Sequence, residues 1–281
     1  MIKKIVYSLW SKPNEGFYGF NSEKSFIECF ALSYIFSKRN FEKVELVTDL
    51  LGEKLLVDKY GFQFNSISTE LESINYIDSM HWAIGKIFAC KIQKEPFLHI
   101  DNDVILFKEL PKFFLEKDSI FQSYEGSFFR EYYTDLLKYS KMSYNNKPVW
   151  HNLSEPNAYN CGILGFNDLS VLETWWEESL NYIKHVDSIG IPKNKTTSLI
   201  FEQVFIYELC NYNNFDIGLL SDFYSKGEEI QFLNEELTTE LGYTHLISNS
   251  KKNTENENKI SKRLMLEDVN LFNKIKIINE N

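Results

Sequence analysis

The sequence predicts an α/β fold with a mostly parallel central sheet and flanking helices. In the first hundred residues, short apolar runs alternate with amphipathic helical patterns, an order that produces β-α-β units. The segment "PFLHIDNDVILF" (96–107) is a near-continuous apolar run interrupted by charge, and its flanks are typical of strands buried in a parallel sheet. With 281 residues, the chain can bury a sizeable core.

The expected elements follow from hydrophobic spacing of two or of three to four residues. We expect strands at 4–10, 43–49, 64–68, 96–100, 119–126, 161–166, 216–220 and 244–248, so that Asp101 and Asp103 lie where the fourth strand ends. We expect helices at 22–38, 50–61, 79–93, 128–144, 172–183, 198–211 and over the last amphipathic stretch, 264–275.

Composition and charge exclude several classes of protein. Hydrophobic residues make up 43% of the chain, which excludes disorder. The formal charge is -10 and no basic run is present, so we expect no nucleic-acid partner. The four cysteines are widely spaced without a C-x-x-C pair, which indicates buried thiols of a cytoplasmic protein.

Asp101 and Asp103 are the most informative residues. They are two positions apart, so on a continuous strand both carboxylates would lie on one face. Two close, partly buried carboxylates repel each other unless a cation lies between them. Mg²⁺ and Mn²⁺ bind carboxylates together with phosphate oxygens, so we expect Mn²⁺ or Mg²⁺ here. A surface turn is the alternative interpretation.

The order of motifs around this pair resembles the GT-A type glycosyltransferases, in which a strand ends in a metal-binding Asp-X-Asp motif. Downstream, "NAYNCGILGF", "FEQVFIYEL" and "THLISNSKK" resemble segments of the group that includes glycogenin and bacterial galactosyltransferases. The likeness spans about residues 5–252. Glu202 stands where the group has Asp, and the glycine expected after the late histidine is not in its usual place.

The resemblance implies a GT-A-like Rossmann-type sandwich and a hexosyltransferase-like enzyme of polysaccharide biosynthesis. Its partners would be a nucleotide-sugar donor, a UDP-sugar in first place, and a glycan or other hydroxyl acceptor; retention of configuration is favoured. The implied metal ligands are Asp101, Asp103 and His245. The implied contacts to the donor are Tyr7, Trp10, Asp49, Lys86, Asp101, Asn102 and Lys251, with Lys252 as the alternative to Lys251. The implied catalytic residues are Gln203, Glu202, Asn160 and Glu125.

Several of these residues also have a purely structural interpretation. Asp49 could cap the following helix instead of contacting ribose or base. Lys86 could lie on a solvated helix face, and His245 could be an ordinary core residue. Asn160 and Gln203 could cap a turn or a helix. Glu125 would be the base of an inverting enzyme, which a retaining enzyme does not need.

We expect a catalytic domain at 1–252, with a nucleotide-binding half at about 1–108 and an acceptor-binding half at about 109–252. A polar linker and an amphipathic helix would follow at 253–281. We expect that helix to dock on the domain; weak binding at the inner face of the membrane is the alternative.

Two other functions fit parts of the sequence. "HIDNDVIL" also matches the nucleophile strand of haloacid-dehalogenase-like phosphohydrolases. Against this, three expected strands precede it and the second acidic motif of that group is missing. A transferase-like module that binds glycan without turnover would leave both aspartates unexplained.

Overall fold

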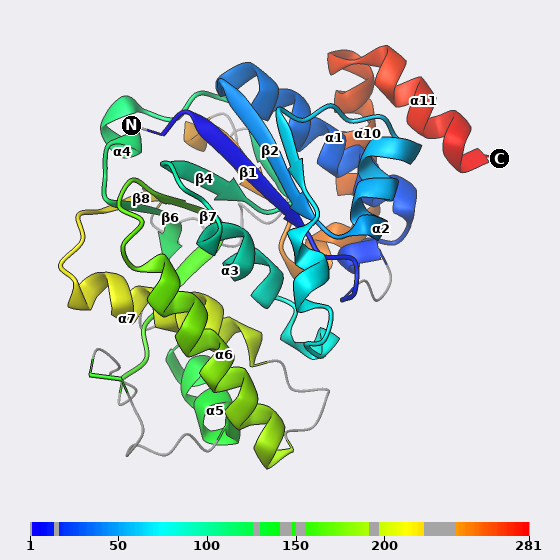
Figure 1. Ribbon diagram of the computed structural model, residues 1–281. Helices are drawn as coiled ribbons and strands as arrows, with labels where there is room; N and C mark the ends of the chain where they lie inside the picture. The colour runs from blue at the N-terminus through cyan, green and yellow to red at the C-terminus, as the bar shows by residue number, and fades with distance from the viewer. Residues whose placement is uncertain are drawn as a thin grey trace. The chain divides into compact units, whose positions relative to one another are not determined.

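The computed structural model describes residues 2–13, 17–125, 130–140, 148–149, 155–190, 197–221 and 240–280. Seven strands form one mostly parallel sheet in the order β3-β2-β1-β4-β7-β6-β8, and β5 pairs with β9 in a two-stranded sheet (Figure 1). The α/β class with a mostly parallel central sheet and flanking helices is therefore confirmed.

The chain divides into two compact units, each built from separate stretches of sequence. Unit 1 comprises residues 1–2, 73–98 and 112–225, and unit 2 comprises residues 3–72, 99–111 and 226–281. The expected halves, about 1–108 and 109–252, remain a prediction.

Unit 2 begins with parallel strands separated by a helix, as the alternating pattern predicts. Its elements are β1 (Lys4–Leu9), α1 (Glu23–Asn40), β2 (Lys43–Thr48), α2 (Leu50–Glu53), a π-helical turn (Lys54–Lys59), β3 (Ser66–Ser68), β5 (Val104–Leu106), β9 (Tyr243–His245) and a 3-10 turn (Ser248–Lys252). Helix α1 begins where predicted, because the Ser22 side chain accepts a hydrogen bond from Ser25 N and caps the first turn.

The C-terminal residues of unit 2 form two helices, α10 (Thr254–Glu267) and α11 (Val269–Glu280). A polar linker was expected from residue 253 and a helix from residue 264, but residues 254–263 already belong to α10. Asn253 caps α10, and Ile260 and Leu264, four residues apart, bury one face of an otherwise polar helix. The helix packs on α1, with Arg39 2.5 Å from Glu267.

Unit 1 combines both strand directions. Its elements are α3 (Ile84–Lys91), α4 (Lys112–Leu115), β6 (Ser119–Tyr124), α5 (Arg130–Ser140), β7 (Tyr159–Phe166), α6 (Leu172–Ile189), a π-helical turn (Ile200–Val204), α7 (Phe205–Tyr212) and β8 (Ile217–Ser221), while β4 (Phe97–Ile100) spans the division. Strand β6 pairs antiparallel with β7 and parallel with β8.

Two helix predictions in unit 1 differ from the structure. The helix expected at 79–93 is a 3-10 turn, Ser79–His81, followed by the shorter α3, because the Asp78 side chain accepts from Met80 N and caps the turn separately. Of the helix expected at 128–144, α5 accounts for 130–140; residues 128–129 and 141–144 lie outside the described part of the chain.

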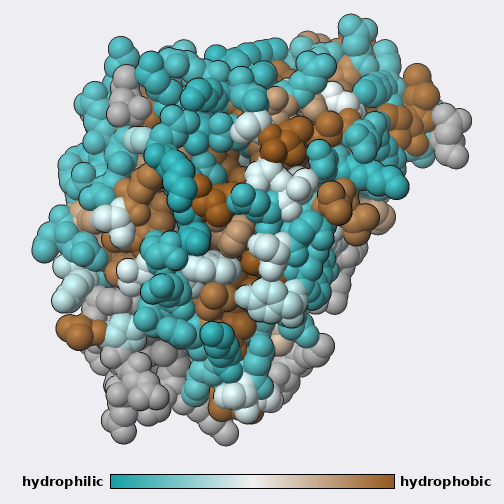
Figure 2. Space-filling model, in the orientation of Figure 1, coloured by the Kyte–Doolittle hydropathy of each residue, from teal (hydrophilic) through white to brown (hydrophobic). Residues whose placement is uncertain are grey.

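The surface is largely polar on the face shown in Figure 2, with scattered hydrophobic residues. Some of the exposed hydrophobic side chains belong to α10 and α11, such as Leu266, Val269 and Ile277. No helix among the described residues is both long and apolar enough to cross a membrane. Peripheral membrane association through these helices stays a prediction.

The packing of α10 can be tested with two leucines of the same helix. Leu264 is fully buried, whereas Leu266 is 70% exposed. Leu264→Ala should lower the free energy of unfolding by about 2–5 kcal/mol, because it removes buried methyl groups and leaves a cavity. Leu266→Ala should change it by less than about 0.5 kcal/mol. Urea unfolding of both variants checks this, and equal effects would contradict docking of α10.

Candidate metal centre

Asp101 and Asp103 lie in a tight turn at the end of a buried strand. Strand β4 ends at Ile100 and β5 begins at Val104, whose N–H donates to the Asp101 carbonyl oxygen over 3.0 Å. The strand therefore ends at the aspartates as expected, and the chain turns between the two residues instead of keeping both on one face of a strand. The turn is not a plain surface turn either, since Asp103 is only 5% exposed.

Strand pairing brings His245 to this turn. Strands β5 and β9 are antiparallel, with Val104 opposite His245, and Leu246 N donates to the Asp103 carbonyl oxygen over 3.1 Å. His245 Nε2 lies 3.4 Å from Asp103 Oδ1. Each of Asp101, Asp103 and His245 has one potential ligand atom in this group, and the three atoms lie within 4.8 Å of one another.

These three side chains could hold a divalent ion. With metal–ligand bonds of about 2.1 Å, neighbouring ligand atoms of an octahedral ion are about 3 Å apart and opposite ones about 4.2 Å apart. The spacing of the Asp-Asp-His group is close to that range. Carboxylates suit Mg²⁺ and Mn²⁺, and imidazole binds transition metals, so the residues fit a small divalent cation.

Lys251 provides a positive charge at the same carboxylate. Its Nζ lies 2.6 Å from Asp103 Oδ2 and donates to the Tyr18 carbonyl oxygen over 3.3 Å. Burial raises the pKa of the Asp103 carboxyl, but Lys251 and His245 outweigh burial and hold that pKa well below its usual range. Burial lowers the pKa of Lys251, and Asp103 more than reverses this effect.

The turn also contains Asn102, a predicted donor contact. Its side-chain Nδ2 donates to the Ser8 carbonyl oxygen over 3.0 Å. Its Oδ1 is buried without a hydrogen-bond partner in the described part of the chain. This leaves one acceptor oxygen available within the acidic turn.

His99 was missed by the sequence reasoning. This residue is buried on β4, its Nε2 lies 2.8 Å from Ser8 Oγ, and its Nδ1 lies 4.0 Å from Asp101 Oδ1. Its position two residues before Asp101 was the available signal, because alternate residues of a strand share a face. His99 supports the acidic turn from the strand side.

The side chain of Tyr7, a predicted donor contact, lies in the core under α1. Its side chain is 0% exposed, and its hydroxyl is hydrogen bonded to Ser33 Oγ and Ser37 Oγ of α1 at 2.7 and 2.8 Å. The alternation of β1 turns this side chain into the helix-covered core, and the donor contact of Tyr7 stays a prediction. Trp10, just after β1, is also buried, and its donor contact stays a prediction.

Asp49 has the structural role that we considered as an alternative. Its Oδ1 accepts from Gly52 N over 2.8 Å and caps α2, and its Oδ2 accepts from Ser11 N and Ser11 Oγ, each over 2.7 Å. Both carboxylate oxygens thus have protein donors. A ribose contact through Asp49 remains a prediction.

Lys86 and Glu202 form a buried ion pair in unit 1. Lys86 Nζ lies 2.5 Å from Glu202 Oε1 and donates to the Cys161 carbonyl oxygen over 3.0 Å. The solvated-face interpretation of Lys86 is therefore wrong. Its expected contact with the donor stays a prediction, and the structure shows a carboxylate as its partner.

A second polar group of unit 1 contains the other expected catalytic residues. Asn160 Nδ2 donates to Glu125 Oε1 over 2.9 Å, and the Tyr133 hydroxyl contacts both Glu125 and the Gln203 side-chain oxygen. Burial and the Glu125 charge raise the pKa of Tyr133 well above its usual value, so it stays a donor. Tyr133 was missed, because tyrosines are frequent here and its stretch has no motif.

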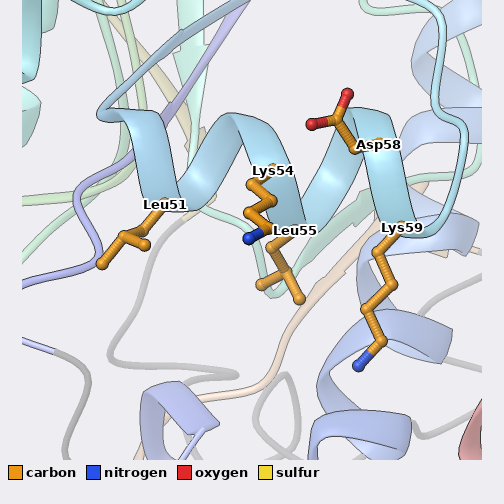
Figure 3. A pocket seen from close by; sticks show the side chains of 5 residues that line it. All are labelled: Leu51, Lys54, Leu55, Asp58 and Lys59. Carbon is orange, nitrogen blue, oxygen red and sulfur yellow. The ribbon is translucent and has the colours of Figure 1, made fainter.

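A surface pocket of about 450 Å³ lies elsewhere in unit 2. Leu51, Lys54, Leu55, Asp58 and Lys59 line it, and Leu51 and Leu55 extend from the same side of the helix (Figure 3). None of the predicted site residues is among them.

Two solved structures of transferases are similar to the chain. The chain resembles the crystal structure of mouse xyloside xylosyltransferase 1 in its apo form with 10% identity and a TM-score of 0.42, covering 89% of this chain and 99% of that one. It resembles the inositol-1-phosphate CTP transferase from T. maritima with 12% identity and a TM-score of 0.40, covering 94% and 96%. These likenesses are too distant to support an argument about the site.

No curated protein matches the sequence significantly. A family model does match, over residues 3–278, which is nearly the whole chain. The chain therefore belongs to DUF6734, a family of unknown function.

Proposed function

We propose that the protein is a metal-dependent glycosyltransferase that moves a sugar from a nucleotide-sugar, in first place a UDP-sugar, to a glycan or other hydroxyl acceptor. One observation carries the proposal: Asp101, Asp103 and His245 present ligand atoms within 4.8 Å of one another, with Lys251 on Asp103. Two distant segments of sequence contribute to this group, and their motifs resemble those of GT-A enzymes in the same order.

Each residue of the centre has a role in this reaction. Asp101, Asp103 and His245 hold the ion, which when bound supplies Lewis-acid stabilisation of the leaving diphosphate. The Lys251 ammonium offers a second positive charge to the same diphosphate, whose negative charge grows as the sugar–oxygen bond breaks. Lys251 takes this role rather than Lys252, because Lys252 is exposed and Lys251 contacts Asp103.

The polar group of unit 1, taken by itself, offers amide groups that suit sugar hydroxyls. In the proposal, Gln203 and Asn160 bind sugar hydroxyls, and Glu202 with Lys86 holds the Gln203 segment in place. Glu125 already accepts hydrogen bonds from Asn160 and Tyr133. A carboxylate engaged in this way is a poor base for an acceptor hydroxyl, which favours the retaining mechanism.

The rival phosphohydrolase function is less well supported. Such an enzyme would need a further acidic pair near Asp101 and Asp103, and in the described part of the chain the third metal-binding group is His245. Products distinguish the possibilities. With Mn²⁺ and UDP-sugar but no acceptor, a transferase releases UDP slowly. With simple phosphate esters as substrates, a phosphohydrolase releases inorganic phosphate. A binding module shows neither activity.

The metal ligands can be tested by calorimetry with UDP and Mn²⁺. Asp101→Asn and Asp103→Asn should each weaken Mn²⁺-dependent UDP binding by about 100-fold or more, because each removes a charged ligand. Asp58→Asn is the control, since Asp58 is an exposed aspartate of the same unit. Unchanged UDP affinity in either ligand variant would refute the proposed function.

His245 requires its own measurement. His245→Gln should weaken Mn²⁺ binding by about tenfold or more, since it replaces an imidazole ligand. His185→Gln, a change outside the centre, should leave Mn²⁺ affinity unchanged. An unaltered Mn²⁺ affinity in His245→Gln would remove His245 from the metal shell without affecting the role of the aspartates.

Glu125 tests the mechanism. If the enzyme is retaining, Glu125→Gln should keep UDP-sugar hydrolysis within about tenfold of the unmodified rate, because the amide preserves the shape of the polar group. Loss of a true general base costs about 10²–10⁴-fold. Initial rates of UDP release separate the two results, and a loss in that larger range would indicate inversion.

A further inference from the structure

Lys251 and the candidate metal share one carboxylate. Lys251 Nζ lies 2.6 Å from Asp103 Oδ2, while Asp103 Oδ1 lies 3.4 Å from His245 Nε2, on the side of the metal-ligand group. Two cations close to one buried carboxylate repel each other, and the repulsion is screened less than it would be in bulk water. The metal ion and Lys251 therefore influence each other's binding to Asp103.

The lysine is held in place by more than Asp103. Its ammonium donates to the Tyr18 carbonyl oxygen over 3.3 Å and lies 5.6 Å from the centre of the Phe20 ring. Phe17, Tyr18 and Gly19 are three consecutive residues with φ of 55°, 57° and 89°. Such backbone is unfavourable for non-glycine residues and persists where the surrounding structure fixes it.

Gly19 shows how closely this turn packs on the lysine. A Cβ atom at position 19 would lie 3.3 Å from Lys251 Cδ. The turn thus contacts the lysine stem, and the Tyr18 carbonyl contacts its head. The position of the ammonium is therefore built into the fold.

We propose that Lys251 is a built-in counter-cation of the metal centre: it weakens binding of the divalent ion alone and strengthens binding of the ion together with a nucleoside diphosphate. This inference rests on the proposed function, because it takes Asp101, Asp103 and His245 as the metal ligands. It makes metal and diphosphate binding mutually dependent.

Charge balance gives the reason. Two carboxylates and one ammonium leave the centre with a single negative charge, so a divalent ion alone leaves it positive in a largely buried place. A diphosphate group brings the compensating negative charge and meets both cations. Binding free energies are linked, so each ligand raises the affinity for the other by the same factor.

The test measures Mn²⁺ affinity by calorimetry with and without UDP. Lys251→Gln removes the charge but keeps a hydrogen-bond donor for Asp103 and Tyr18. We expect this variant to bind Mn²⁺ alone about tenfold or more tightly, because a close positive charge is gone. The factor by which UDP increases Mn²⁺ affinity should fall at least about tenfold, since the diphosphate loses one of its two cations. Lys252→Gln, on the same turn but exposed, should change neither quantity.

Each outcome of these titrations supports or overturns the inference. Unchanged or weaker Mn²⁺ affinity in Lys251→Gln overturns the inference, because Lys251 would then only orient Asp103. If Asp103→Asn binds Mn²⁺ as tightly as the unmodified protein does, the proposed function fails instead. Should the variant unfold too easily for calorimetry, the Mn²⁺-induced rise in its melting temperature reports the same affinity. A rise no larger than that of the unmodified protein also overturns the inference.

Discussion

The buried carboxylate of Asp103 is the constraint on which the candidate site depends. A charged group so well shielded from water is stable only with cations beside it. The fold supplies Lys251 on one oxygen and places His245 by the other. The pairing of β5 with β9 makes this possible, because it fixes the C-terminal segment against the acidic turn in a single register.

The two units compensate their buried charged and polar side chains in different ways. In unit 2 the charged centre has neighbours that could exchange for an ion or a phosphate. In unit 1 the buried polar side chains are bonded to one another: Lys86 to Glu202, and Glu125 to Asn160 and Tyr133. Hydrogen bonds between buried side chains of this kind hold the side chains in defined positions.

The sequence was sufficient for the parts of the fold that repeat regularly. The alternation of β1, α1 and β2 follows from hydrophobic spacing and from the Ser22 cap. The aspartates were found because charge inside an apolar run is rare. Their turn was considered only as an alternative, because local propensity does not distinguish a surface turn from a buried one that carries charge. His245 was found through a motif resemblance, and its contact with Asp103 depends on a strand pairing across about 140 residues, which no local pattern predicts.

The surroundings of Tyr7, Tyr133 and His99 were also beyond what local sequence patterns can predict. Tyr7 lies on the strand that leads toward the site, but the face of a strand on which each residue lies depends on what covers the sheet, and α1 covers the Tyr7 face. Tyr133 and His99 belong to the polar groups only through tertiary contacts. The polar start of α10 concealed a helix because two buried positions were enough to dock it.

The discontinuity of unit 2 has a consequence for how the protein is made. Residues 3–72 and 99–111 supply the strands and the acidic turn, but β9 and Lys251 belong to the stretch that begins at residue 226. During synthesis, Asp103 leaves the ribosome long before β9 and Lys251 have been made. Until then its carboxylate has to remain hydrated, so the contacts around Asp103 form late and depend on nearly the whole chain.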